Sequence, residues 1–486
     1  GMLRAGRCRA LASALAAALL AAPGTALQAP PLQAGPLSPD AESIAKCVRA
    51  GGSQPPVPWE RAEPAITELF QDLHRNFRPF MYPLPVEDVC FNNPAYLNTG
   101  FLLESTIYKR MQISKMRTNN SEAANAFYLP TFTACWRFNK AGREEGSAAA
   151  ADRTKKAVEK IASKYPYFNR HHGARHFWVS TADMGKPEPA AWAPEDFAKH
   201  SSALVNTAHP TDMHSMVDRW MQRRTIFPPY AFNPVHDVSL VCNGDPDAPR
   251  IARERVNDPV RKRKYAVFFV GRPIGCVDCR SKFNRSDLGL ISMHQHHESS
   301  MEEEEDYDPG LMRGVLQSFQ TPGSAALSWA EVGSEEGGLD LSGKPVRISM
   351  KEHHYPRDKY LRMLAESDFC LAPRGSRIWS PRLFEAVWFG CVPVIFADDY
   401  YLPGTCVWDW RKMAIFIRED KVNRTSSILQ GVSGKWLVEA RSRLLKVRQH
   451  FMWHVDEVQG DAFDLAMLDV YLKQVQAAGP SAMAGQ

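Results

Sequence analysis

Residues 367–400 read SDFCLAPRGSRIWSPRLFEAVWFGCVPVIFADDY, and this stretch decides the fold class. The short apolar run at 368–371 predicts a buried strand. Ser380-Pro381 matches the residue preferences of a helix N-cap and first turn, and Gly390 is suited to end that helix. Residues 392–397 predict the next strand. The stretch is therefore one complete β-α-β unit, which is typical of a parallel sheet.

The loop between the first strand and the helix is rich in arginine. Arg374, Arg377 and Arg382 fall within nine residues, at the start of the helix. The amides and dipole of a helix N-terminus favour an anion, and guanidinium groups suit phosphate. Glu385 lies one turn beyond Arg382, so it points the same way and can accept hydrogen bonds from two ribose hydroxyls. The pattern favours a nucleoside diphosphate site over its alternative, a solvated helix end with a surface ion pair.

Apolar runs that alternate with helical stretches extend this pattern along the chain. Residues 126–130 and 175–180 predict two strands before a boundary near 240–258, and residues 265–270 predict another strand after it. Such alternation favours parallel sheets. The chain has 486 residues, more than one hydrophobic core usually organises. We therefore expect an α/β fold of two domains that face each other across a cleft, with ligands at the carboxyl ends of the strands.

Changes in composition mark further segments. Arg4, Arg7 and Arg9 precede a run of about 13 apolar residues, the pattern of a signal peptide or a short signal-anchor. A small, charged stretch at 141–152 predicts a loop. The expected segments are the signal at 1–26, a flexible Pro/Ala-rich stem at 27–58, an N-terminal domain at 59–245, a C-terminal domain at 246–475 with a partly disordered insertion at 285–345, and a tail at 476–486.

Charge and cysteine content exclude some classes of protein. The net charge is 59 − 54 = +5, too small to indicate a nucleic-acid partner. The basic run at 261–264 is interpreted as a solvated lead-in to the next strand rather than a nuclear signal. Nine of the ten cysteines follow Cys8, so at least one thiol is free or pairs with another chain. Cys276 and Cys279 lack a second CxxC, which favours a disulfide or plain thiols over a zinc site.

The segment at 373–386 resembles the signature of the exostosin family, glycosyltransferase family 47. The shared form is PRG-x-R-x-x-S-x-R-x-x-EA followed by CVPV, as in the heparan-sulfate exostosins, whereas SPR and the later LPG resemble the plant and algal branch. The resemblance covers roughly residues 60–470. Other pieces similar to the family's lie at 120–130, 165–170, 183–185, 237–239, 268–272, 409–410 and 461–463.

This resemblance implies a GT-B fold of two Rossmann-like domains, with the nucleotide sugar bound mainly by the C-terminal one. It implies an inverting transfer from a UDP-sugar to a glycan or glycoprotein. No metal or other cofactor is expected, because cationic side chains stabilise the leaving diphosphate; Asp398-Asp399 is accordingly interpreted as a turn. Tyr360 either stacks on the base or packs in the helix. The residues predicted at the nucleotide sugar are Gly271, Arg272, Arg280, Tyr360, Arg374, Arg377, Ser380, Arg382 and Glu385.

The resemblance also implies a location in the Golgi lumen. The family is usually attached to the membrane by the N-terminus; cleavage of the signal and secretion is the alternative. Sequons at Asn119, Asn284 and Asn423 agree with a lumenal address. A homodimer or a heterodimer is left open.

The transfer needs a base that takes the proton of the acceptor hydroxyl. The candidates are Asp183 and His176, for which the alternatives are a helix cap and a structural histidine. Arg175, Ala182 and Met184 differ from the residues usual in the family. A second hypothesis is therefore a catalytically silent partner subunit or glycan-binding module.

Overall fold

The computed structural model describes most of the predicted domains. The part of the chain from Leu37 onward forms one compact unit. The described stretches are 36–84, 102–134, 140–181, 185–186, 195–209, 232–270, 314–315, 318–319, 340–341, 344–349, 356–374 and 378–477. The predicted signal, most of the predicted insertion and most of the predicted tail lie outside them.

The first sheet has five parallel strands, which follow one another in space as they do in the chain. The strands predicted at 126–130 and 175–180 are both confirmed. In order, the strands are β1 (Pro79–Met81), β2 (Ala126–Leu129), β3 (His176–Ser180), β4 (Ser202–Val205) and β5 (Val238–Ser239).

Alternate residues of these strands enter two different cores, because successive side chains point to opposite faces of a sheet. On β2, Ala126 and Tyr128 join one core, whereas Phe127 and Leu129 join the other. Burial on both faces explains why these strands are apolar throughout. Helices α2 (Trp59–Asn76) and α5 (Leu103–Ile113) share the first core, and α7 (Lys140–Lys164), α8 (Tyr167–His171) and α10 (Glu195–His200) share the second.

The second sheet has six strands, which are parallel except that β7 runs antiparallel to β8. The strands predicted at 265–270, 368–371 and 392–397 are confirmed. The range predicted as an insertion was too long, because its last residues belong to β7 and β8. In spatial order, the strands are β11 (Ile415–Phe416), β10 (Val392–Phe396), β9 (Ser367–Pro373), β6 (Tyr265–Val270), β8 (Lys344–Ser349) and β7 (Asp340–Leu341).

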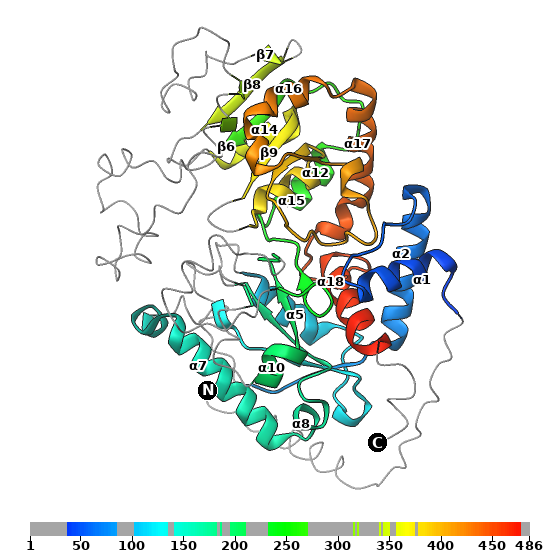
Figure 1. The fold of residues 1–486 in the computed structure, drawn as a ribbon, viewed down its shortest axis with the longest axis vertical. Coiled ribbons are helices and arrows are strands. Elements are labelled where there is room, and N and C mark those ends of the chain that lie inside the picture. Colours follow the sequence, from blue (N-terminus) through cyan, green and yellow to red (C-terminus); the bar gives the residue numbers. More distant parts are fainter. Residues whose placement is uncertain are drawn as a thin grey trace, which may run out of the picture. The chain divides into compact units, whose positions relative to one another are not determined.

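Helix α15 (Pro381–Trp388) connects β9 to β10 and packs against both strands (Figure 1). Ser380 stands at the N-cap position, and Gly390 has a φ of +57°, a left-handed conformation that suits glycine. The predicted β-α-β unit is thus confirmed. The other helices of this half are α12 (Ala248–Arg255), α14 (Arg357–Glu366), α16 (Thr425–Gln430), α17 (Gly434–Val447) and the 3-10 turns η8 (Trp410–Lys412), η9 (Glu419–Arg424) and η10 (Arg448–Phe451).

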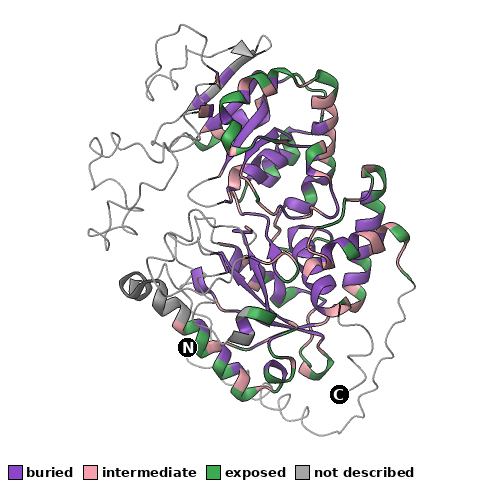
Figure 2. Cartoon of the chain, in the orientation of Figure 1, coloured by how far each residue is buried: buried purple, intermediate pink, exposed green. Residues whose placement is uncertain are grey.

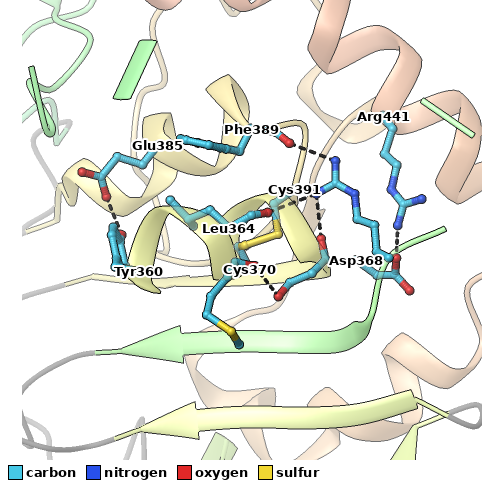
Figure 3. Close-up of a disulfide and its surroundings, with 11 residues drawn as sticks. Tyr360, Leu364, Asp368, Cys370, Glu385, Phe389, Cys391 and Arg441 are labelled. Atoms are coloured by element: carbon cyan, nitrogen blue, oxygen red, sulfur yellow. Dashed lines mark hydrogen bonds and ion pairs between the residues drawn. A yellow bond between two sulfur atoms is a disulfide. The ribbon is translucent and has the colours of Figure 1, made fainter. Parts of the chain in front are cut away.

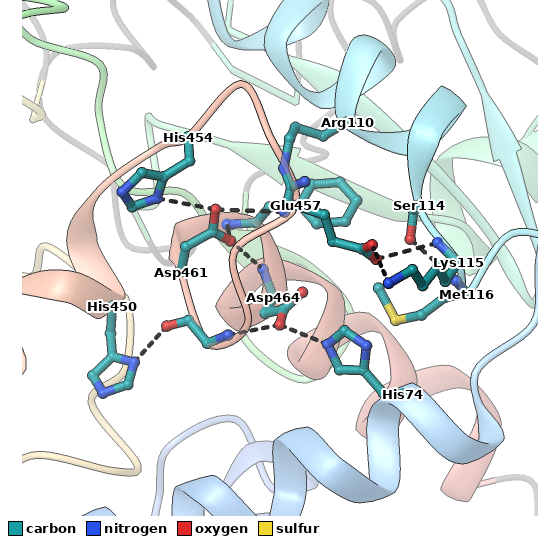
Figure 4. A network of polar contacts seen from close by, with 12 residues as sticks. His74, Arg110, Ser114, Lys115, Met116, His450, His454, Glu457, Asp461 and Asp464 are labelled. Atoms are coloured by element: carbon teal, nitrogen blue, oxygen red, sulfur yellow. Dashed lines mark hydrogen bonds and ion pairs between the residues drawn. The ribbon is translucent and has the colours of Figure 1, made fainter.

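The end of the described chain returns to the first sheet, although the sequence assigned 246–475 to the second domain. Helix α18 (Ala462–Val470) packs against α2 and β5, and its π-helical continuation η11 (Tyr471–Gln476) packs against β2. Figure 4 shows the polar side chains that join the start of α18 to helices α2 and α5. Asp461 caps α18 and pairs with Arg110 of α5, and Asp464 lies 2.7 Å from the His74 ring nitrogen of α2.

Two stretches predicted to be irregular are helical. Helix α1 (Pro39–Arg49) lies within the predicted stem at 27–58; Ser38 caps it, and its apolar face is buried against α2 and η11. Cys47 also forms a disulfide with Cys406. Helix α7 includes the predicted loop at 141–152, whose small residues include many alanines, the best helix formers. Figure 2 shows the strands β2, β3, β4, β9 and β10 buried, whereas α17 carries both buried and exposed residues.

Candidate functional site

Arg382 lies in the first turn of α15, at the carboxyl end of β6. Its Nε donates to the backbone carbonyl of Val270 at 2.9 Å, and its guanidinium carbon lies 5.4 Å from the centre of the Phe269 ring. Nη1 lies 3.4 Å from Ser380 Oγ, a weak contact, and Nη2 has no hydrogen-bond partner among the described residues. The Ser380 side chain makes no capping hydrogen bond. With respect to the described residues, the Arg382 guanidinium is thus anchored through Nε, while Nη2 is left for another partner.

Arg374 stands at the same edge but is already paired. Its backbone N–H donates to the carbonyl of Phe396, the last residue of β10, and its Nε donates to Glu419 Oε1 at 2.8 Å. The Glu419 N–H in turn faces the carboxylate of Asp398. Asp398 and Asp399 form a turn, as the sequence predicted, and Asp399 has a φ of +62°. The ion pair neutralises Arg374 in this arrangement.

Glu385 is a buried carboxylate, 7% exposed, and each of its oxygens accepts a hydrogen bond from the protein. Oε2 accepts from the Tyr360 hydroxyl at 2.5 Å, and Oε1 accepts from the Asp245 backbone N–H at 3.1 Å (Figure 3 shows the contact with Tyr360). Burial raises the pKa of Glu385, against the lowering effect of these two donors and of Arg382. Burial raises the pKa of Tyr360 well above its ordinary value.

Asp245 connects this carboxylate to the N-terminus of α14. Its own side chain makes a bidentate ion pair with Arg357, which also donates to Asp247. Burial acts to raise the pKa of Asp245, but the hydrogen bonds from Arg357 outweigh it and the pKa is lowered. The neighbouring Gly244 lies so close that a Cβ there would be 2.7 Å from Glu385 Oε1. Sequence reasoning missed these residues, because more than 100 positions separate Asp245 from both Arg357 and Glu385.

A disulfide and a buried arginine brace the same β-α-β unit. Cys370 of β9 is bonded to Cys391, which precedes β10 (Figure 3). Arg263 donates to the backbone carbonyls of Leu364, Ser367 and Phe389, near the C-terminal ends of α14 and α15. The prediction of a solvated basic run is therefore wrong for Arg263, which is 4% exposed. Carbonyls left unpaired at helix ends provide the acceptors that this buried guanidinium needs.

His176 is a buried member of the first sheet rather than a group presented to solvent. Its Nδ1 lies 2.9 Å from the carbonyl of Ala174, which can only accept, so Nδ1 carries the proton. Its Nε2 accepts from the Tyr82 hydroxyl at 2.9 Å. The ring stacks on Tyr82 and Phe127, and burial lowers its pKa to about 4. This geometry favours the structural alternative for His176 over the role of base.

The remaining residues predicted at the site lie outside the described stretches. They are Asp183, Gly271, Arg272, Arg280 and Arg377. Three positions after Asp183 in the sequence, Lys186 is described. Its Nζ forms a buried ion pair with Asp237 Oδ2 at 2.9 Å. Asp237 also accepts from the N–H groups of Ala203 and Asn233, so this motif residue organises the sheet.

Two further observations concern metals and membranes. Within the described stretches, no three His, Cys, Asp or Glu side chains gather as a metal site would require. Among the same residues, no helix combines the length and apolar character that a membrane crossing needs. The predictions on cofactors and on N-terminal attachment stay predictions.

The two sheets of mainly parallel strands with helical crossovers form an α/β fold that is consistent with a Rossmann-like architecture. Residues 71–432 match the model of the Exostosin GT47 domain, and the chain belongs to this family of glycosyltransferases. The resemblance in the β9-α15 loop is thereby confirmed.

Relatives of this chain include plant proteins whose names assign them to the same class. A probable glycosyltransferase of Arabidopsis thaliana is 24% identical over 409 residues; the match covers 84% of this chain but only 64% of the relative's length. A probable glucuronosyltransferase of Physcomitrium patens is 26% identical; the match covers 79% of this chain and 72% of the relative's length. A probable β-1,4-xylosyltransferase of Arabidopsis thaliana is 25% identical and covers 84% of each.

One solved structure also aligns with most of the chain. The N-terminal domain of a Candida albicans trehalose-6-phosphate phosphatase covers 82% of this chain and 97% of its own length at 11% identity. Its TM-score of 0.36 is too low to carry an argument about fold or function.

Proposed function

We propose that this glycosyltransferase is an inverting enzyme of the GT-B type that takes its sugar from a UDP-sugar and transfers it to a glycan or glycoprotein. The observation that carries the proposal is the placement of Arg382 and Glu385 one turn apart on α15, at the carboxyl edge of the second sheet. A cation at a helix N-terminus suits the diphosphate, and a carboxylate one turn later suits the ribose. The names of the relatives make UDP-glucuronic acid and UDP-xylose the first donors to test.

In the proposed reaction, the acceptor oxygen attacks the anomeric carbon as the bond to the diphosphate breaks. Arg382 stabilises the negative charge that develops on the leaving phosphate, with Arg272, Arg280 and Arg377 as further candidates. A metal ion is not required if these cations act together. Asp183 is the remaining candidate from the sequence for the base that takes the acceptor proton.

We place the protein in the lumen of the secretory pathway, with the Golgi as the expected compartment. Two disulfides among the described residues, Cys47–Cys406 and Cys370–Cys391, support an oxidising environment. The side chains of Asn119 and Asn423, two of the three sequon asparagines, are exposed and accessible to a glycan.

Calorimetry with UDP tests the donor site. We expect Arg382→Ala and Glu385→Ala each to weaken UDP binding by about tenfold or more, because each removes a charge-assisted hydrogen-bonding group. Arg418→Ala is the matched control, since Arg418 is 74% exposed and pairs only with Asp420 among the described acidic residues. An unmutated protein that does not bind UDP would contradict the donor-site proposal.

Hydrolysis of the donor without an acceptor then separates an enzyme from a silent subunit. UDP release from UDP-glucuronic acid, UDP-xylose and other UDP-sugars is the measurement. UDP binding without turnover of any donor or transfer to any acceptor would favour a silent subunit. Loss of hydrolysis in Asp183→Asn with UDP binding intact would support Asp183 as the base, and unchanged activity would remove it.

A further inference from the structure

Two neighbours hold the Glu385 carboxylate at the proposed ribose site, through contacts that the sequence did not predict. We infer that Tyr360 and the Asp245 backbone amide are positioning groups, which orient the Glu385 carboxylate so that it selects ribonucleotides over 2′-deoxyribonucleotides. This inference rests on the proposed function and deepens it.

The hydrogen-bonding capacity of Glu385 matches a ribose diol. An ionised carboxylate has about four acceptor positions, two on each oxygen. The Tyr360 hydroxyl occupies one on Oε2, and the Asp245 N–H occupies one on Oε1. Within the described part of the chain no other group donates to this carboxylate, which leaves one position on each oxygen for one hydroxyl of the 2′,3′-diol. A 2′-deoxyribose would leave one of these buried acceptor positions unmatched, which is the basis of the expected discrimination.

The two positioning groups come from different elements and are themselves fixed. Tyr360 belongs to α14, and its ring packs against Phe268 of β6 at 5.7 Å between centroids. Asp245 precedes α12, and Arg357 of α14 holds its side chain through two hydrogen bonds. Helix α14 therefore supports both donors, since Tyr360 and Arg357 both belong to it. Gly244 leaves room for the carboxylate, since any side chain there would press on it.

The charge of Glu385 depends on the same neighbours. The titratable and charged groups that face it are Tyr360 from α14, Arg382 from its own helix and Asp245. Burial raises its pKa, and the Tyr360 hydroxyl, the Asp245 N–H and Arg382 oppose that rise. Loss of the Tyr360 donor would raise the pKa further. Protonation would then remove the negative charge and turn one acceptor position into a donor at a higher pH, so UDP affinity would begin to fall at a higher pH on acidification.

The test compares UDP with 2′-deoxy-UDP by calorimetry on the full chain between pH 5 and 8. We expect the unmutated protein to prefer UDP by about tenfold, the effect of one hydrogen bond to a charged group. Tyr360→Phe should reduce this preference to about threefold or less and move the acid limit of UDP binding to higher pH. Gly244→Ala should also reduce the preference, because its methyl group displaces the carboxylate without removing a donor.

Tyr471→Phe is the matched control. The Tyr471 hydroxyl donates to the buried carboxylate of Asp72 at 2.9 Å, the same chemistry away from Glu385. This variant should keep both the preference and the pH limit, and circular dichroism should show all variants folded. A Tyr360→Phe protein that keeps both properties, or an equal effect in Tyr471→Phe, would overturn the inference. If the protein binds UDP but does not prefer it over 2′-deoxy-UDP, the inference is overturned and the proposed function stands. If the protein does not bind UDP, the proposed function is overturned as well.

Discussion

His176 shows how a histidine of a family motif can be committed to packing. Both ring nitrogens have protein partners, and the ring is stacked between aromatic side chains with no exposure to solvent. Because burial lowers its pKa to about 4, the folded protein does not bind a proton there at pH 5, whereas the unfolded chain does. The residue is thus a source of acid sensitivity rather than of catalysis.

The free energy of unfolding should fall as the pH is lowered from 6.5 to 4, by up to about 3 kcal/mol from His176 alone. His176→Gln removes this contribution, so its stability should depend less on pH in that range. Denaturant titrations at several pH values measure the difference. His74 is a control of opposite sign, because its hydrogen bond with Asp464 raises its pKa. The stability that His74 contributes is fully present below pH 6.5 and is lost as the pH rises through its raised pKa. His74→Gln should therefore lower the stability in acid by a nearly constant amount and change the slope of the acid loss little.

At the scale of elements, the β9-α15-β10 unit is stabilised independently of its ligand-binding residues. The Cys370–Cys391 disulfide closes a segment with a sequence separation of 21. Arg263 connects the C-terminal ends of α14 and α15, and Arg441 of α17 forms a buried ion pair with Asp368 of β9. These contacts fix the strands from which Arg374 and Arg382 extend.

Replacement of both Cys370 and Cys391 by alanine should lower the free energy of unfolding by about 3 kcal/mol, the value that chain entropy predicts for a loop of this length. Thermal unfolding of the oxidised protein and the variant measures the effect. UDP affinity at 25 °C should change little, because the bond does not contact Arg382 or Glu385. A variant as stable as the parent protein would show that the disulfide adds nothing to the native unit.

At the scale of the whole molecule, segments from both ends of the described chain complete the first sheet. Helix α1 packs against α2 and η11, and the Cys47–Cys406 disulfide joins it to residues 359 positions away. Helix α18 and η11 cover strands whose other face is covered by α7, α8 and α10. Neither α1 nor η11 can therefore be removed without exposing a core.

A chain that begins at Leu37 should keep the thermal stability of the full protein, because α1 is intact in it. A chain that begins at Pro58 loses the buried Ile44, Ala45 and Val48 and leaves Cys406 unpaired. We expect this chain to lose about 5 kcal/mol or more and to aggregate on heating. Thermal unfolding followed by gel filtration compares the two proteins. Equal melting temperatures would contradict the structural role of α1.

The sequence by itself determined the local units of this protein. The apolar run of β9, the Ser380-Pro381 start of α15, Gly390 and the run of β10 are neighbours in the chain, so short-range preferences define them. The same local preferences predicted that Arg382 and Glu385 lie one turn apart on a single helix. Composition misled the prediction for α1 and α7, because proline-rich and alanine-rich stretches contain helices when a capping residue or a helix-favouring run is present.

Only the tertiary structure decided which partners these residues have. Four contacts join residues that are far apart in the sequence. They are the hydrogen bond from the Asp245 amide to Glu385, the ion pair of Glu419 with Arg374, the hydrogen bonds of Arg263 to two helix ends, and the hydrogen bond from Tyr82 to His176. Burial is also a property of the whole fold, and it determines that His176 stays neutral while Arg263 is covered. Such contacts depend on how the elements pack, and one sequence carries no local signal for them. The sequence predicted both the Glu385 carboxylate and Tyr360 at the site, but not that Tyr360 and the Asp245 amide donate to this carboxylate.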